Sequence, residues 1–149
     1  MAEVLFYHVQ NQPLDRVLPQ LLEKTVERGW RALVRAGSPE RVAALDDALW
    51  TFADESFLPH GTRLDGREAE QPVYLTATGE NPNGAKVLFL VDGALAEDVG
   101  AFERVVVVFD GADRAAVGAA RETWRKVTGA GHAATYWMQD ERGRWAKKA

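Results

Sequence analysis

Three side chains with recognition chemistry are closely spaced in one segment towards the C-terminal end. Arg121, Trp124 and Arg125 stand at i, i+3 and i+4, so a helix would gather them into one patch with an indole between two guanidinium groups. Guanidinium groups bind carboxylates, and an indole offers an apolar face. The patch therefore fits a short peptide with negative charge and an apolar side chain, such as an acidic tail with its terminal carboxylate. Alternatively, Trp124 packs under the last strand beside solvated arginines, and the spacing does not decide between the two.

Two aspartates stand where strand ends present magnesium ligands in nucleotide-dependent hydrolases. Asp92 follows the apolar run 87–91, and Asp110 follows the run 105–109. Each precedes a glycine, however, and Asp-Gly is ordinary turn chemistry. Because no phosphate-binding loop accompanies them, the turn interpretation is favoured over the hydrolase or helicase-like alternative.

Glycine placement argues against a nucleotide phosphate site. The first expected strand-to-helix turn, residues 8–15, contains no glycine, although a dinucleotide fingerprint needs glycines there. The stretch GENPNGAK (79–86) resembles a phosphate loop, but Ala85 displaces the lysine. The chain then continues into an apolar strand where a helix N-terminus is required. We interpret this stretch as an Asn-Gly turn.

Metal and nucleophile patterns are not found either. His8, His60 and His132 lie far apart and lack the spacing of a zinc site. The chain has no cysteine, which excludes a thiolate metal site, a cysteine nucleophile and a disulfide framework. The sequence gives no positive indication of catalysis and implies no cofactor and no metal site.

A second aromatic cluster lies at the end of an expected helix and in the loop after it. Trp50 stands one residue beyond the apolar stripe of that helix, so it is rotated from the stripe by about 100°. Phe57 and Pro59 follow in the loop. Aromatic side chains off the core stripe form interface patches. The alternative, slightly favoured by the pattern alone, is that the loop folds back and buries Trp50 within the monomer.

The elements that position these residues alternate between strand and helix. The unbroken apolar run in 104–111 indicates a strand buried on both faces, and the polar turn after residue 139 suggests a short hairpin. The alternation predicts an α/β fold: a three-layer, Rossmann-like sandwich on a mostly parallel sheet with helices on both faces. Strands are expected at 3–9, 30–36, 72–78, 86–93, 104–111 and 132–139, and helices at 13–28, 38–52 and 113–128.

Composition sets the broad class. A chain of 149 residues with 46% hydrophobic content is most simply one domain, residues 1–149. The start lacks a signal peptide pattern and no apolar run reaches membrane-span length, so we expect a cytoplasmic protein without membrane contact. The net charge of −4 is uneven, because residues 121–149 carry seven basic and three acidic side chains. A direct DNA-binding role would need a broader basic face than this balance indicates.

Several stretches together resemble the chi subunit family of bacterial DNA polymerase III over nearly the full chain. They are FYHV, RALVRAGSPERVAALDDALWTFADESFLPHG, VLFLVDG, FERVVVVFDG and AARETWRKVTGAGHAATYW. The most specific element is LDDALWTFADESFLPH, residues 45–60.

The resemblance implies a non-catalytic adaptor of the clamp-loader assembly with a Rossmann-like fold. Such adaptors contact the acidic, phenylalanine-ended C-terminal tail of single-stranded DNA-binding protein, and thereby single-stranded DNA indirectly. They also hold the small psi subunit. Carried onto this chain, the tail site corresponds to Arg121, Trp124 and Arg125, with Val117 as a weaker candidate. The psi-facing surface corresponds to Trp50, Phe57 and Pro59.

Two departures from the family pattern affect these expectations. Val117 stands where a basic residue can serve the tail in relatives, so the contacts are expected to be weaker or redistributed. The C-terminal stretch QDERGRWAKKA extends beyond the short C-terminus of some relatives, and Arg144, Lys147 or Lys148 can replace the missing charge. The partner of the Trp50 surface is less secure than the tail ligand, because not every bacterium with chi has a recognisable psi subunit. In some bacteria the same surface of chi also serves a helicase-like protein.

Overall fold

A computed structural model describes residues 2–10, 14–50, 60–62, 68–96, 98–140, 142 and 144–149. The strands are β1 (Glu3–Val9), β2 (Ala32–Arg35), β3 (Val73–Thr76), β4 (Val87–Leu90), β5 (Arg104–Asp110), β6 (Ala133–Gln139) and β7 (Trp145–Lys147). The helices are α1 (Leu14–Glu27), α2 (Pro39–Trp50) and α3 (Arg114–Gly129), with the 3₁₀ helices η2 (Glu68–Glu70) and η3 (Val99–Ala101).

These strands form one seven-stranded sheet in the order β3-β2-β4-β5-β1-β6-β7. Its paired strands run parallel except β6 and β7, which are antiparallel and form the expected short hairpin. Strand β2 lies between β3 and β4, so the Asn-Gly turn that joins them in sequence does not close a hairpin. The predicted mostly parallel α/β sheet is confirmed. The two 3₁₀ helices were not foreseen.

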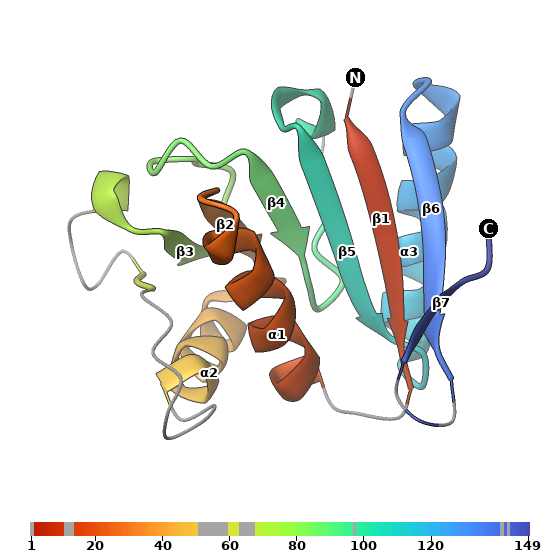
Figure 1. Ribbon diagram of the computed structural model, residues 1–149, viewed down its shortest axis with the longest axis horizontal. Helices are drawn as coiled ribbons and strands as arrows, with labels where there is room; N and C mark the ends of the chain where they lie inside the picture. The colour runs from red at the N-terminus through yellow and green to blue at the C-terminus, as the bar shows by residue number, and fades with distance from the viewer. Residues whose placement is uncertain are drawn as a thin grey trace.

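The helices cover both faces of the sheet, which confirms the three-layer arrangement (Figure 1). Leu18 and Leu22 of α1 and Leu45 of α2 are buried against one face, here called the α1 face. Ala120 and Val127 of α3 are buried against the other, the α3 face. Burying one large apolar side chain stabilises the folded state by about 1.5–3 kcal/mol. These two clusters are therefore the main source of stability.

Strand β1 is central and supplies side chains to both faces. Because successive strand residues point to opposite faces, Phe6 and His8 lie on the α3 face, whereas Leu5 and Tyr7 lie on the α1 face. The parallel register continues each set onto neighbouring strands, since Phe6 is opposite Tyr136 and Tyr7 is opposite Trp137 of β6. One strand therefore contributes to two separate surfaces.

Side-chain caps begin two of the helices. Asp113 accepts hydrogen bonds from the backbone N–H groups of Ala115 and Ala116, at 3.0 and 3.2 Å, and so caps α3. Ser38 Oγ accepts from the backbone N–H of Arg41 at 3.2 Å, which confirms the predicted start of α2.

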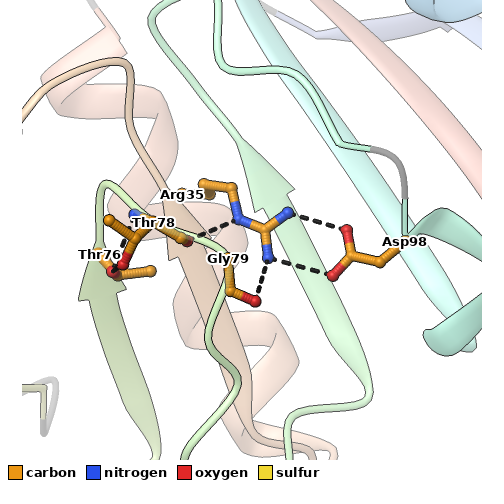
Figure 2. Close-up of polar contacts among 5 residues, drawn as sticks. All are labelled: Arg35, Thr76, Thr78, Gly79 and Asp98. Carbon is orange, nitrogen blue, oxygen red and sulfur yellow. Dashed lines mark hydrogen bonds and ion pairs between the residues drawn. The ribbon is translucent and has the colours of Figure 1, made fainter.

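A buried arginine joins two loops beyond the carboxyl end of β2 (Figure 2). Arg35 is 5% exposed, and its guanidinium group binds both carboxylate oxygens of Asp98, at 2.9 and 3.3 Å. It also donates to the carbonyl oxygens of Thr78 and Gly79. The hydrogen bonds and charge of Arg35 hold the pKa of Asp98 below its ordinary value. This clamp stabilises the scaffold and lies outside the pockets described below.

Candidate functional site: a basic and aromatic pocket on the α3 face

The four residues expected at the tail site line one pocket on the α3 face. The cavity is about 250 Å³ and is bounded by α3 and by strands β1, β5 and β6. We call it the α3-face pocket. Its lining residues are Phe6, His8, Phe109, Val117, Ala120, Arg121, Trp124, Arg125 and Tyr136.

Aromatic rings form the inner wall of the α3-face pocket. Trp124 contacts Phe6 edge-to-face, with ring centroids 5.1 Å apart, and lies 6.5 Å from Tyr136 in a similar orientation. Phe109 lies 6.1 Å from Tyr136. Edge-to-face pairs of this kind are favourable, so the rings hold one another in place. The pocket therefore offers a preformed apolar surface to an incoming ring.

Trp124 packs against the core, as the alternative interpretation expected, and its role in binding a peptide stays a prediction. It is partly buried, packs against the core on the α3 face and also lines the pocket. Ala116, Ala120 and Val127 form the core-facing stripe of α3, as expected, and Trp124 lies at its margin.

His8 and Tyr136 form a polar pair inside the α3-face pocket. His8 Nδ1 and the Tyr136 hydroxyl are within hydrogen-bond distance. Burial lowers the pKa of His8, although nearby Asp110 opposes the shift, and burial raises the pKa of Tyr136 against the charge of Arg121. Both groups are therefore uncharged at neutral pH. Gly111 leaves room for the imidazole, because a Cβ there would lie 1.8 Å from His8 Nε2.

Two arginines at the α3-face pocket are available to bind anions. Arg121 and Arg125 are exposed, and in the described part of the chain no carboxylate forms an ion pair with either. By contrast, Lys126 on the same helix pairs with Glu122 at 3.4 Å. No acidic side chain of the described residues lines the pocket. Two unneutralised guanidinium groups next to an aromatic wall suit a ligand with carboxylates and an apolar side chain.

The sequence pattern identified the helical half of this pocket and missed the strand half. Phe6, His8, Phe109 and Tyr136 come from three strands, of which β5 and β6 flank α3 in sequence and β1 is distant from it. The available signal was the alternation of β1, which places Phe6 and His8 on one face. Which helix covers that face does not follow from local alternation.

The second predicted surface falls largely outside the described residues. Trp50 ends α2, but its side chain is not described, and Phe57 and Pro59 lie outside the described ranges. Their role at a partner interface stays a prediction.

The two aspartates considered as metal ligands have structural partners. The Asp92 carboxylate pairs with Arg41 at 2.9 Å, and its backbone has a φ of +53°, as found in turns. Asp110 accepts a hydrogen bond from the backbone N–H of Ala112 at 2.8 Å. Both observations favour the turn interpretation. Within the described residues, no group of three or more histidine, aspartate or glutamate side chains is placed to hold a metal ion.

The other histidines also contact structural neighbours. His60 is buried, with its Nε2 atom 3.1 Å from Asp46 Oδ1, and His132 Nδ1 accepts from the backbone N–H of Ala2 at 3.0 Å. Among the helices described, none is both long enough and apolar enough to cross a bilayer.

The fold and pocket define an α/β domain that presents a basic, aromatic pocket and lacks the glycine pattern of a phosphate site. The sequence matches the family described as "DNA polymerase III chi subunit, HolC" over residues 1–135. The chain therefore belongs to the chi subunit family of DNA polymerase III, whose members are accessory subunits in DNA replication.

Two relatives bear the same designation. The chain is 26% identical over 117 residues to the probable DNA polymerase III subunit chi of Rickettsia prowazekii, covering 74% of this chain and 71% of the relative. It is 32% identical over 93 residues to the DNA polymerase III subunit chi of Pseudomonas aeruginosa, covering 60% of this chain and 63% of the relative. The second alignment thus spans less than two thirds of either protein.

Proposed function

We propose that this chain is a non-catalytic adaptor of the replicative polymerase that binds the acidic C-terminal tail of single-stranded DNA-binding protein in the α3-face pocket. The observation that supports this most directly is the pair of unneutralised guanidinium groups, Arg121 and Arg125, beside a preformed aromatic wall. Membership of the chi family supplies the replication context.

The chemistry of each part of the pocket matches one part of the tail. The terminal phenylalanine ring packs against Trp124 and Tyr136 in the cavity, where it is removed from water. The tail carboxylates bind Arg121 and Arg125 through charge-assisted hydrogen bonds, worth about 1.5–3 kcal/mol each and weakened by salt where exposed. Val117 contributes an apolar contact at the edge of the cavity, since it lines the pocket without a charge.

A second partner completes the adaptor role. In this proposal Trp50, Phe57 and Pro59 anchor a psi subunit, or another protein at the same surface, and so connect the tail-bound chain to the clamp loader. Contact with single-stranded DNA through the tail is then indirect. The hydrolase alternative has less support, because Asp92 and Asp110 both make structural contacts.

The experiment is a titration with a synthetic peptide of the last residues of the organism's single-stranded DNA-binding protein, at two salt concentrations. Binding is followed by tryptophan fluorescence and confirmed by calorimetry. Arg121→Ala should weaken binding about tenfold or more at low salt, because a charge-assisted hydrogen bond is lost. Trp124→Ala should weaken it as well, with circular dichroism used to verify that the variant is folded.

Arg114→Ala is the matched control, because Arg114 is also an exposed arginine of α3 but does not line the pocket. Equal weakening by Arg114→Ala and Arg121→Ala would mean that only general charge attraction is measured. Absence of binding at low salt by both methods would contradict the proposed tail site.

A further inference from the structure

A second pocket lies on the opposite face of the sheet, where α1 leaves strands β1, β6 and β7 uncovered (Figure 1). It also measures about 250 Å³, and we call it the α1-face pocket. The lining residues that matter here are Tyr7, Lys24, Arg28, Arg104, Trp137 and Trp145.

Three partly exposed aromatic rings form one wall of the α1-face pocket. Tyr7 and Trp137 are nearly parallel, with an interplanar angle of 20° and ring centroids 6.3 Å apart. Trp145 meets Tyr7 edge-on at 4.8 Å. The arrangement follows from the strand register, because Tyr7 is opposite Trp137 and Trp137 is opposite Lys147. Tyr7, Trp137 and Lys147 thus form a row on one face of the sheet.

Three cationic side chains also line the α1-face pocket, beside neutral residues. Lys24 and Arg28 come from α1 and the residue after it, Arg104 comes from β5, and no acidic side chain of the described residues lines the cavity. Glu3 pairs with Arg104 at 3.4 Å and partly neutralises it. In the described residues no carboxylate forms an ion pair with Lys24, which is exposed. The cluster is thus locally cationic although the whole chain is acidic.

We infer that the α1-face pocket binds single-stranded DNA directly, with a base against the Tyr7, Trp137 and Trp145 rings and the adjoining phosphates at Lys24, Arg28 and Arg104. Accessible aromatic faces and neighbouring cations are the two components of single-strand recognition. A cavity of this size, below the usual range for drug-sized ligands, accommodates one flat ring system. An acidic peptide that lacks an aromatic side chain would use the cations and leave the aromatic wall unused.

The inference adds a function to the proposed tail adaptor. The two pockets lie on opposite faces of one sheet, so single-stranded DNA and the tail peptide can be bound at the same time. When this protein is bound to the tail of single-stranded DNA-binding protein, it would thereby also contact the DNA that the latter covers.

The test measures fluorescence anisotropy of a labelled oligothymidylate with the full chain over a range of low salt concentrations. The pair Lys24→Glu and Arg16→Glu is decisive, because both residues are exposed on α1 and both changes alter charge equally. Only Lys24 lines the pocket. Lys24→Glu should weaken binding at least about tenfold relative to Arg16→Glu, and lower the log–log salt slope by about 0.7.

A second set of variants tests the aromatic wall. Trp137→Ala should weaken binding at least about fivefold, and Trp137→Phe should restore most of it, because stacking needs an aromatic face rather than an indole. Lys24→Glu keeps the test valid if Trp137→Ala does not fold.

Four results would overturn the inference. They are no binding at low salt, equal binding by the two charge variants, displacement of the oligonucleotide by the acidic tail peptide, and tighter binding of an oligouridylate. The third would place the DNA in the α3-face pocket, and the fourth would make RNA the ligand. Oligothymidylate binding that is retained in the Arg121→Ala variant supports the α1-face pocket as the DNA site. This outcome does not depend on whether the tail peptide binds.

Discussion

The α3-face and α1-face pockets have similar volumes and both combine arginines with aromatic rings, yet they are assembled differently. One helix supplies most of the α3-face pocket, including both of its arginines. The α1-face pocket draws on α1 and on strands β1, β4, β5, β6 and β7. The comparison shows that a pocket on one helix is visible as a spacing in the sequence. A pocket collected from several strands is not.

The arginines also differ in their surroundings. Arg121 and Arg125 of the α3-face pocket are exposed and form no ion pair among the described residues, whereas Arg104 of the α1-face pocket pairs with Glu3. The guanidinium groups of Arg28 and Arg104 also lie 5.7 and 5.3 Å from the centre of the Trp30 ring. Cation–π contacts of this kind restrain the side chains that make them. Arg28 and Arg104 are therefore more restrained than Arg121 and Arg125.

The largest expected effect is a loss of stability in the scaffold that both pockets share. Arg35→Met leaves Asp98 and the carbonyl groups of Thr78 and Gly79 without their donor. It should lower the free energy of unfolding by about 2–4 kcal/mol, measured by urea denaturation. Arg41→Met is the control, because the Arg41–Asp92 pair is more exposed and should cost less than about 1 kcal/mol. Similar losses in both would contradict the structural importance of the buried clamp.

A change on one face of the sheet should affect one pocket and leave the other intact. Gly111→Ala places a Cβ against His8, so it should lower the free energy of unfolding by about 1–3 kcal/mol and displace the imidazole into the α3-face pocket. Tail binding should fall while oligothymidylate binding is retained. Gly118→Ala on α3 meets no atom within 4 Å and should raise stability by up to about 1 kcal/mol. If Gly111→Ala changes neither the free energy of unfolding nor tail binding, Gly111 is not packed closely against His8.

The helix caps offer a third test of about 1 kcal/mol. Asp113→Ala removes the cap of α3, and Ser38→Ala removes that of α2, which lies on the other face. Both changes should lower the free energy of unfolding by similar amounts in thermal or urea denaturation. Only Asp113→Ala should weaken tail binding, because α3 lines that pocket and α2 does not. Equal binding losses would indicate that the pocket senses overall stability rather than α3.

The smallest expected effect is a pH dependence of the free energy of unfolding, which arises from His8 on the α3 face. Burial lowers the pKa of His8, so the unfolded chain binds more protons than the folded chain just below the ordinary histidine value of about 6.5. The contribution of neutral His8 is thus complete above that pH and is lost as the pH falls through the folded pKa. Urea denaturation at several pH values should show a shallower decline for His8→Gln. Identical slopes in the two proteins would show that His8 does not titrate differently in the folded state.

Local patterns were sufficient where neighbours in sequence are neighbours in space. The i, i+3, i+4 spacing correctly brought Arg121, Trp124 and Arg125 together, and Ser38 was correctly placed as the start of a helix. Turn chemistry likewise accounted for Asp110. These features depend on contacts within one helical turn or one loop, which residue type and spacing control directly.

Contacts between distant segments were not predictable in the same way. Nothing in the spacing joins Phe6 to Trp124, Tyr7 to Trp145, or Arg35 to Asp98. Each of these pairs exists because elements far apart in sequence are brought together by the strand order, the strand register and the packing of helices and loops on the sheet. A shift of one residue in that register would move every strand side chain to the other face.

The sequence by itself therefore determined the class of fold, the family and the helical half of the α3-face pocket, because periodicity and short-range hydrogen bonding act within one element. Only the tertiary structure decided that β2 separates β3 from β4, that β1 serves two pockets, and that aromatic and cationic side chains from several elements meet on the α1 face. The physical reason is that strand order and helix placement depend on burying apolar faces across the whole chain. Burial of these faces brings into contact residues that are far apart in sequence and that no local sequence pattern connects.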